Sequence, residues 1–106
     1  MNNLCMLIYN VTTKVSWHAQ EDWVQWMINH HIPEVLQTGL INKYQLVRLQ
    51  EVEDIDGPTF AVQYYIENRG DYEKYLKDFA PALREKSLSR WGDQVIAFRT
   101  LMEVIN

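Results

Sequence analysis

The residues with the clearest chemical potential are two adjacent histidines, His30 and His31, followed by Ile32 and Pro33. Histidine titrates near neutral pH, so it can transfer protons or bind a metal. Adjacent residues on a regular helix point about 100° apart, so the two rings cannot face the same way. Pro33 removes a backbone donor and predicts a kink or a new turn. His31, at this helix end, is the candidate catalytic residue; the alternative is a half-buried histidine bonded to backbone.

A metal site is not predicted. No second cluster of histidine or cysteine accompanies the pair, and the single Cys5 excludes both an internal disulfide and a cysteine-based metal cluster. Cys5 lies in an apolar run, which is typical of a small buried hydrophobic residue. The sequence has no glycine-rich phosphate loop, serine nucleophile elbow or paired-carboxylate signature. We therefore expect no cofactor, and no motif names a reaction.

Charge and composition narrow the classes of partner. The 106 residues carry a formal net charge of −4 and their basic residues are scattered, so neither nucleic acid nor a membrane is an expected partner. The apolar run from Leu4 ends at Asn10, which is too short for a membrane span or a signal peptide. We expect a cytoplasmic protein that forms one domain over residues 1–106.

The elements that must position these side chains follow from periodicity and turn residues. Four segments rich in β-branched and aromatic residues are predicted as strands: 4–15, 43–54, 59–67 and 94–104. Residues 18–37 and 71–91 carry apolar side chains at helical spacing. The resulting order, βαββαβ, predicts a ferredoxin-like α+β sandwich, with an antiparallel four-stranded sheet and two helices on one face.

Alternation along the strands divides the predicted sheet into two faces. The face expected under the helices is nearly all apolar: Leu7, Tyr9, Val11, Val47, Leu49, Phe60, Val62, Tyr64, Phe98, Met102 and Val104. The opposite face mixes polar and apolar side chains: Ile8, Asn10, Thr12, Tyr44, Leu46, Arg48, Gln50, Ala61, Gln63, Tyr65, Ala97, Arg99, Leu101 and Glu103. Such a mixture is more typical of an interface or a ligand surface than of a face in water.

We interpret the mixed face as a sheet-on-sheet homodimer interface around a shared interior. Buried polar groups are costly unless they are hydrogen-bonded. Five side chains would therefore bond to one another, to water or to a small polar ligand: Asn10, Arg48, Gln63, Arg99 and Glu103. Trp26 and Tyr65 are candidates for the apolar walls of a ligand site, although a tryptophan at helical spacing is more often part of a core.

Several segments resemble a known family. The residues IYNVT at 8–12, HIPEVL at 31–36, VQY at 62–64 and AFRT at 97–100 are similar, in order and spacing, to the small bacterial domain-of-unknown-function family 4286. This resemblance covers almost the entire chain and implies a ferredoxin-like fold, but it transfers no catalytic residue. A helix that ends in histidine, a hydrophobic residue and proline also resembles the dimeric α+β barrel superfamily. That looser resemblance implies two sheets packed into a barrel and a cleft for a small ligand between sheet and helices.

Two functions remain open from the sequence. In the first, a homodimeric barrel binds, or acts on, a small organic molecule without a metal. His31 would then handle a proton, and Arg48 or Arg99 would anchor a carboxylate or an enolate. In the second, the protein is a non-enzymatic structural or interaction module whose polar sheet face is only a dimer interface, with Arg99 and Glu103 fixing its register.

Overall fold

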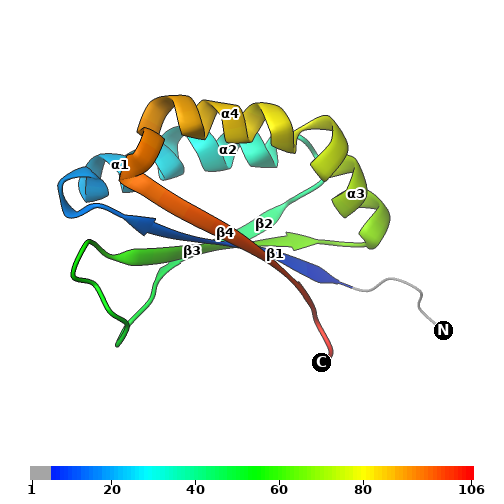
Figure 1. The fold of residues 1–106 in the computed structure, drawn as a ribbon. Coiled ribbons are helices and arrows are strands. Elements are labelled where there is room, and N and C mark those ends of the chain that lie inside the picture. Colours follow the sequence, from blue (N-terminus) through cyan, green and yellow to red (C-terminus); the bar gives the residue numbers. More distant parts are fainter. Residues whose placement is uncertain (1–5) are drawn as a thin grey trace.

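A computed structural model describes residues 6–106, so the prediction for Cys5 lies outside the described residues. One antiparallel sheet has the strand order β2–β3–β1–β4. Its strands are β1 (Leu7–Val15), β2 (Lys43–Arg48), β3 (Thr59–Ile66) and β4 (Val95–Glu103). The helices all lie on one side of this sheet (Figure 1). The predicted ferredoxin-like α+β fold is confirmed.

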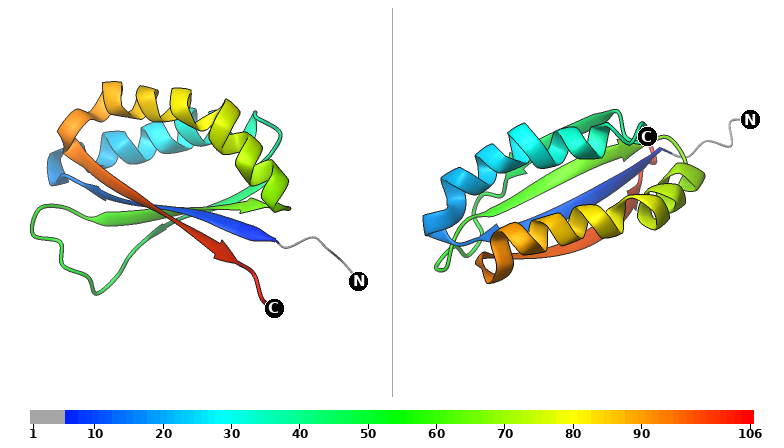
Figure 2. Two further views of the ribbon diagram at one scale, coloured as in Figure 1. Left: turned by 45° about the vertical axis from the view of Figure 1, so that its right-hand side comes forward. Right: turned by 90° about the horizontal axis from the view of Figure 1, so that it is seen from above.

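Two helical segments form the second layer. The segment between β1 and β2 consists of η1 (Trp17–Ala19), α1 (Gln20–Trp26), η2 (Met27–His31) and α2 (Ile32–Leu36). The segment between β3 and β4 consists of α3 (Arg69–Asp78), α4 (Ala80–Trp91) and η3 (Gly92–Gln94). Seen from above, the two segments run in opposite directions across the sheet (Figure 2). Within residues 6–106, no helix has the length and apolar character that crossing a bilayer requires.

The hydrophobic core fills the space between these layers. Trp23 of α1 packs on Phe60 of β3, with ring centroids 5.2 Å apart. Tyr9 of β1 packs against Tyr72 and Tyr75 of α3, each at 5.8 Å. Aromatic side chains bury large apolar areas, and pairs with offset or edge-on rings add to that stabilisation. The contacts hold both helical segments on the same face of the sheet.

The strand register corrects the predicted faces of the two edge strands. Residues directly opposite each other in an antiparallel pair share a face. Arg48 pairs with Phe60, and Arg99 pairs with Val11, so both arginines lie on the helix-facing side. The register also places five further residues on the helix-facing side, although alternation predicted them on the open face: Tyr44, Leu46, Ala97, Leu101 and Glu103. Three residues move to the open face: Val47, Phe98 and Met102.

The alternation misleads at the edge strands because neither of them is well covered. Every residue of β2 and of β4 is exposed or only half-buried, whichever way its side chain points. Selection for apolar residues on one face is therefore weak there, whereas it is strong on a central strand with neighbours on both sides. The predicted faces of the central strands β1 and β3 agree with the register.

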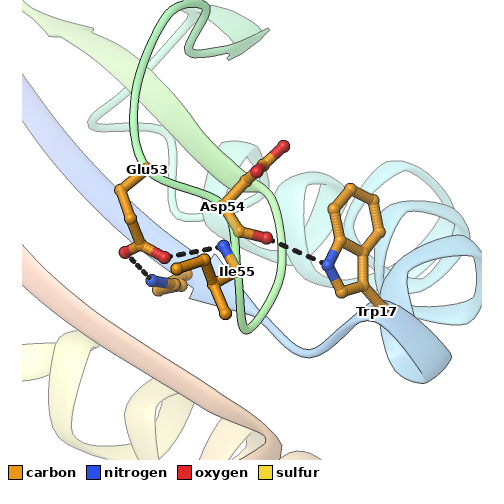
Figure 3. A network of polar contacts seen from close by, with 5 residues as sticks. Trp17, Glu53, Asp54 and Ile55 are labelled. Atoms are coloured by element: carbon orange, nitrogen blue, oxygen red, sulfur yellow. Dashed lines mark hydrogen bonds and ion pairs between the residues drawn. The ribbon is translucent and has the colours of Figure 1, made fainter.

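The loop between β2 and β3 is held against the start of the first helical segment (Figure 3). Glu53 accepts a hydrogen bond from Lys14 Nζ at 2.8 Å and another from the backbone N–H of Ile55 at 2.6 Å. The indole N–H of Trp17 donates to the backbone carbonyl of Asp54 at 3.0 Å. The strand predicted to reach residue 54 ends at residue 48, and the acidic residues that follow belong to this exposed loop.

Candidate functional site

His31 is positioned by a π-helical turn. The turn spans Met27–His31, and the backbone N–H of Ile32 donates to the carbonyl of Met27, five residues earlier. Pro33 has no N–H for the i→i−4 bond of a regular helix, which favours a local change of hydrogen bonding. Such turns occur frequently at functional sites. Here the turn places Met27 and His31 on the wall of one cavity, while Ile32 is buried in the core.

The cavity lies between the helical layer and the sheet and has a volume of about 60 Å³. Its polar wall residues are Tyr9, Thr13, His31, Tyr64, Tyr75, Arg84, Ser87 and Arg99. Its apolar wall residues are Val11, Trp23, Met27, Leu83, Val95 and Ala97. The exposed members of this set belong to α4 and β4, so the cavity opens to solvent between these two elements. A cavity of this size holds roughly four to six water-sized groups.

The described wall of the cavity carries two positive charges and no negative one. Arg84 of α4 and Arg99 of β4 are the charged residues that line it. Arg84 Nη2 donates to Tyr9 Oη at 2.9 Å, which fixes one guanidinium at the mouth. The ion pairs found among residues 6–106 all involve lysine and none includes either arginine. Two guanidiniums without a carboxylate partner attract an anion, which they can bind through charge-assisted hydrogen bonds.

His31 is neutral at physiological pH. Burial lowers the pKa of His31 to about 4, and the positive charges of Arg99 and Lys86 add to this effect while Glu34 opposes it. Its ring stacks on Trp26, with centroids 5.0 Å apart and planes 24° apart. Nδ1 is buried and has no hydrogen-bond partner within residues 6–106. A neutral imidazole can donate or accept one further hydrogen bond at that nitrogen.

Two tyrosines of the cavity wall are held in the protonated form. Burial raises the pKa of Tyr64, and neighbouring tyrosines raise it further. Burial also raises the pKa of Tyr75, Tyr9 adds to the shift, and the charges of Arg84 and Arg99 oppose it. Tyr64 Oη is buried and has no hydrogen-bond partner in the described part of the chain. Both phenols remain hydrogen-bond donors across the physiological pH range.

The cavity brings together His31 and Arg99 from the eight residues predicted for the site. Trp26 stacks on His31 and also contacts Trp91 edge-on, with ring centroids 5.8 Å apart in the second pair. Glu103 lies opposite Leu7 near the end of β4 and is exposed. Trp26 and Glu103 are therefore near the helix-facing layer but do not line the cavity.

The remaining four predicted residues lie elsewhere. Asn10 and Gln63 face each other on the open side of the sheet, and Tyr65 lies on the same side. Asn10 Nδ2 donates to Thr12 Oγ1 at 2.9 Å, so part of its hydrogen-bonding capacity is used within β1. Arg48, at the end of β2, lies over the ring of Trp17 at 5.8 Å. This cation–π contact places Arg48 away from the residues that line the cavity.

Six polar wall residues are not among the predicted site residues: Tyr9, Thr13, Tyr64, Tyr75, Arg84 and Ser87. Alternation predicts that Tyr9 and Tyr64 lie in the core, but it does not predict where a phenol oxygen points. The sequence pattern around Arg84 does indicate that this residue lies near the core. It lies four residues after Ala80, on the stripe that also includes Leu83 and Trp91, and a charge within such an apolar stripe is unusual.

Comparisons with known proteins agree with this architecture. The model of a family described as "Domain of unknown function (DUF4286)" matches residues 6–105. No curated protein matches the chain. The chain is similar to the crystal structure of HapK from Hahella chejuensis, with 11% identity, a TM-score of 0.67 and coverage of 95% of this chain and 93% of that one.

Two further solved structures have the same fold. An ethyl tert-butyl ether d (ethd) family protein from Bacillus halodurans is 8% identical, with a TM-score of 0.64 and coverage of 89% of this chain and 96% of that one. A dimeric ferredoxin-like protein from an uncultured marine organism is 13% identical, with a TM-score of 0.62 and coverage of 96% and 97%. At such low identities the similarity establishes the fold alone.

Proposed function

This chain belongs to the DUF4286 family of domains of unknown function, and we propose that it binds a small organic anion, without a metal, between its helices and its sheet. The observation that carries the proposal is the pairing of Arg84 and Arg99 on the wall of one cavity. Neither arginine takes part in an ion pair with another described residue. An anionic ligand would supply the missing partner, and planar carboxylates match the fork of donors on a guanidinium.

Any chemistry on the bound ligand would use His31. Its buried Nδ1 has no partner among residues 6–106, and a bound ligand would supply one. Burial and the charge of Arg99 lower the pKa of His31. An anion bound at Arg99 would offset the part of this shift that comes from the Arg99 charge, whereas the larger part, which comes from burial, would remain.

The binding proposal is tested by calorimetric titration with acetate, propionate and pyruvate. Arg99→Gln removes the charge while keeping a polar side chain, and we expect it to weaken binding about 10- to 100-fold, the effect of losing a charge-assisted hydrogen bond. Arg48→Gln is the matched control, because Arg48 lies on Trp17 and not on the cavity wall. Equal affinity in Arg99→Gln and the wild type, or no binding of any of these carboxylates, would refute the proposal.

The proposal includes a homodimer formed through the open face of the sheet. Ile96 and Phe98 of β4 project from this face and are 70% and 62% exposed. Polar side chains cross the same face in one row, from Gln45 through Gln63 to Asn10. Amides both donate and accept, so the row can bond to the same row of a second copy. One of the structurally similar proteins is described as dimeric.

The second candidate function is a non-enzymatic interaction module. The exposed apolar residues of β4 favour it, because such patches mark interaction sites. In this case the dimer forms but the cavity holds only water. Arg99 and Glu103 would not fix the register of that dimer, since both lie on the helix-facing side of β4; the amide row would do so. The carboxylate titration separates this candidate from the first.

A further inference from the structure

We infer, building on the proposed anion site, that the ligand is a short carboxylate with a second oxygen on the adjacent carbon, a 2-oxo or 2-hydroxy acid. The carboxylate binds between Arg84 and Arg99, and the second oxygen binds Tyr64 and His31. Each half of this assignment follows from a different property of the cavity wall.

The charged and the uncharged polar groups differ in their exposure. Arg84 and Arg99 are exposed residues on the two elements that flank the cavity mouth, whereas Tyr64 is 2% exposed. An ion keeps part of its hydration at the mouth, and a neutral oxygen is far less costly to bury. The ligand therefore orients with its carboxylate outward and its second oxygen inward.

The inner groups require a partner that the described chain does not provide. Tyr64 Oη and His31 Nδ1 are both buried without a hydrogen bond within residues 6–106, and unpaired buried polar atoms are uncommon in native proteins. The phenol of Tyr64 is a donor, and neutral His31 can donate or accept at Nδ1. A carbonyl oxygen has two lone pairs and can accept from both groups, and a hydroxyl can accept from one and donate to the other.

The size and the apolar part of the cavity limit the rest of the ligand. A volume of about 60 Å³ corresponds to roughly four to six water-sized groups, which matches the six heavy atoms of pyruvate or lactate. Val11, Met27 and Leu83 line the same cavity and provide contacts for a methyl or methylene group. A longer chain would have to extend through the mouth between α4 and β4.

The test compares ligands that differ only at the second position. Pyruvate, lactate and isobutyrate are titrated against the wild type, because isobutyrate keeps the carboxylate and the branched shape but has no second oxygen. We expect pyruvate or lactate to bind about tenfold more tightly than isobutyrate. Tyr64→Phe should reduce this preference to roughly threefold, because the bond from the second oxygen to His31 remains. Tyr72→Phe is the matched control, because Tyr72 packs on Tyr9 but does not line the cavity, and it should keep the preference.

The outcomes separate this inference from the proposal on which it rests. If isobutyrate binds the wild type as tightly as pyruvate and lactate do, the second oxygen is not recognised and the inference is wrong, while the anion site stands. If Tyr64→Phe keeps the wild-type preference, the assignment of Tyr64 is wrong. If none of the three carboxylates binds, the anion site itself is refuted. Far-ultraviolet circular dichroism of each variant confirms that the fold is retained.

Discussion

Replacing Tyr64 by phenylalanine should stabilise the protein when no ligand is present. Tyr64 and Tyr9 face each other across β3 and β1, and both are nearly fully buried, at 2% and 4% exposure. Their hydroxyls differ in one respect. Tyr9 Oη accepts a hydrogen bond from Arg84 at 2.9 Å, whereas Tyr64 Oη has no partner within residues 6–106. The same chemical change at the two positions should therefore have opposite effects.

The expected magnitudes follow from the cost of an unpaired buried hydroxyl. Leaving such a group without a hydrogen bond costs about 1–3 kcal/mol. Tyr64→Phe removes the hydroxyl and should raise the free energy of unfolding by about 1–2 kcal/mol. This is less than the full cost of the unpaired hydroxyl because the small void that the substitution leaves is destabilising. Tyr9→Phe removes a paired hydroxyl and should lower that free energy by about 1 kcal/mol. In a domain of this size each kcal/mol shifts Tm by roughly 4–8 °C.

The assay is urea denaturation at pH 7 without added carboxylate, followed by tryptophan fluorescence. Tyr64→Phe should move the midpoint to higher urea and Tyr9→Phe to lower urea, with unchanged slopes. A loss of 1 kcal/mol or more in Tyr64→Phe would mean that its hydroxyl is already bonded in the free protein. That result would refute the argument that this oxygen is unpaired in the ligand-free protein.

Two further predictions concern pH and assembly. The pKa of His31 is lowered to about 4 in the folded protein, whereas it is about 6.5 in an unfolded chain. Between these two pH values the unfolded state binds a proton on His31 that the folded state does not bind, so the free energy of unfolding should fall as the pH drops from 6.5 towards 4. Stability curves of the wild type and His31→Gln should diverge in that window, and parallel curves would contradict the burial of His31. Phe98→Glu should convert a dimer into the 12.6 kDa monomer in light scattering, whereas Leu88→Glu, on α4 and equally exposed at 62%, should not. A wild-type monomer, or a dimer that survives Phe98→Glu, would contradict the proposed interface.

The sequence predicts the fold well because the central elements carry strong periodic signals. Strands β1 and β3 have neighbours on both sides, so their alternation reports burial, and Tyr9 and Tyr64 were placed correctly under the helices. The edge strands β2 and β4 lack such coverage. Arg99 was therefore assigned to the open face, although the register places it beside the helices.

The candidate site was only partly predictable. Residue type and position before Pro33 identify His31, and Pro33 predicts a local irregularity, but its form as a π-helical turn depends on hydrogen bonds that the sequence does not specify. Arg84 was missed because an isolated charge on a helix is usually a surface residue. The hydroxyl of Tyr64 is unpaired because no hydrogen-bonding group of residues 6–106 lies within reach of it. The spacing of residues in a sequence does not predict such a feature.

The most direct test of the anion site is an NMR titration of the arginine side chains. The Nε–Hε signals of the protein are followed as pyruvate is added, with Arg48, Arg69 and Arg90 as internal references. We predict saturable shifts of the Arg84 and Arg99 signals at a common dissociation constant, with the three references unchanged. Equal, non-saturating shifts of all five signals, or no shift of Arg84 and Arg99, would contradict an anion site in the cavity.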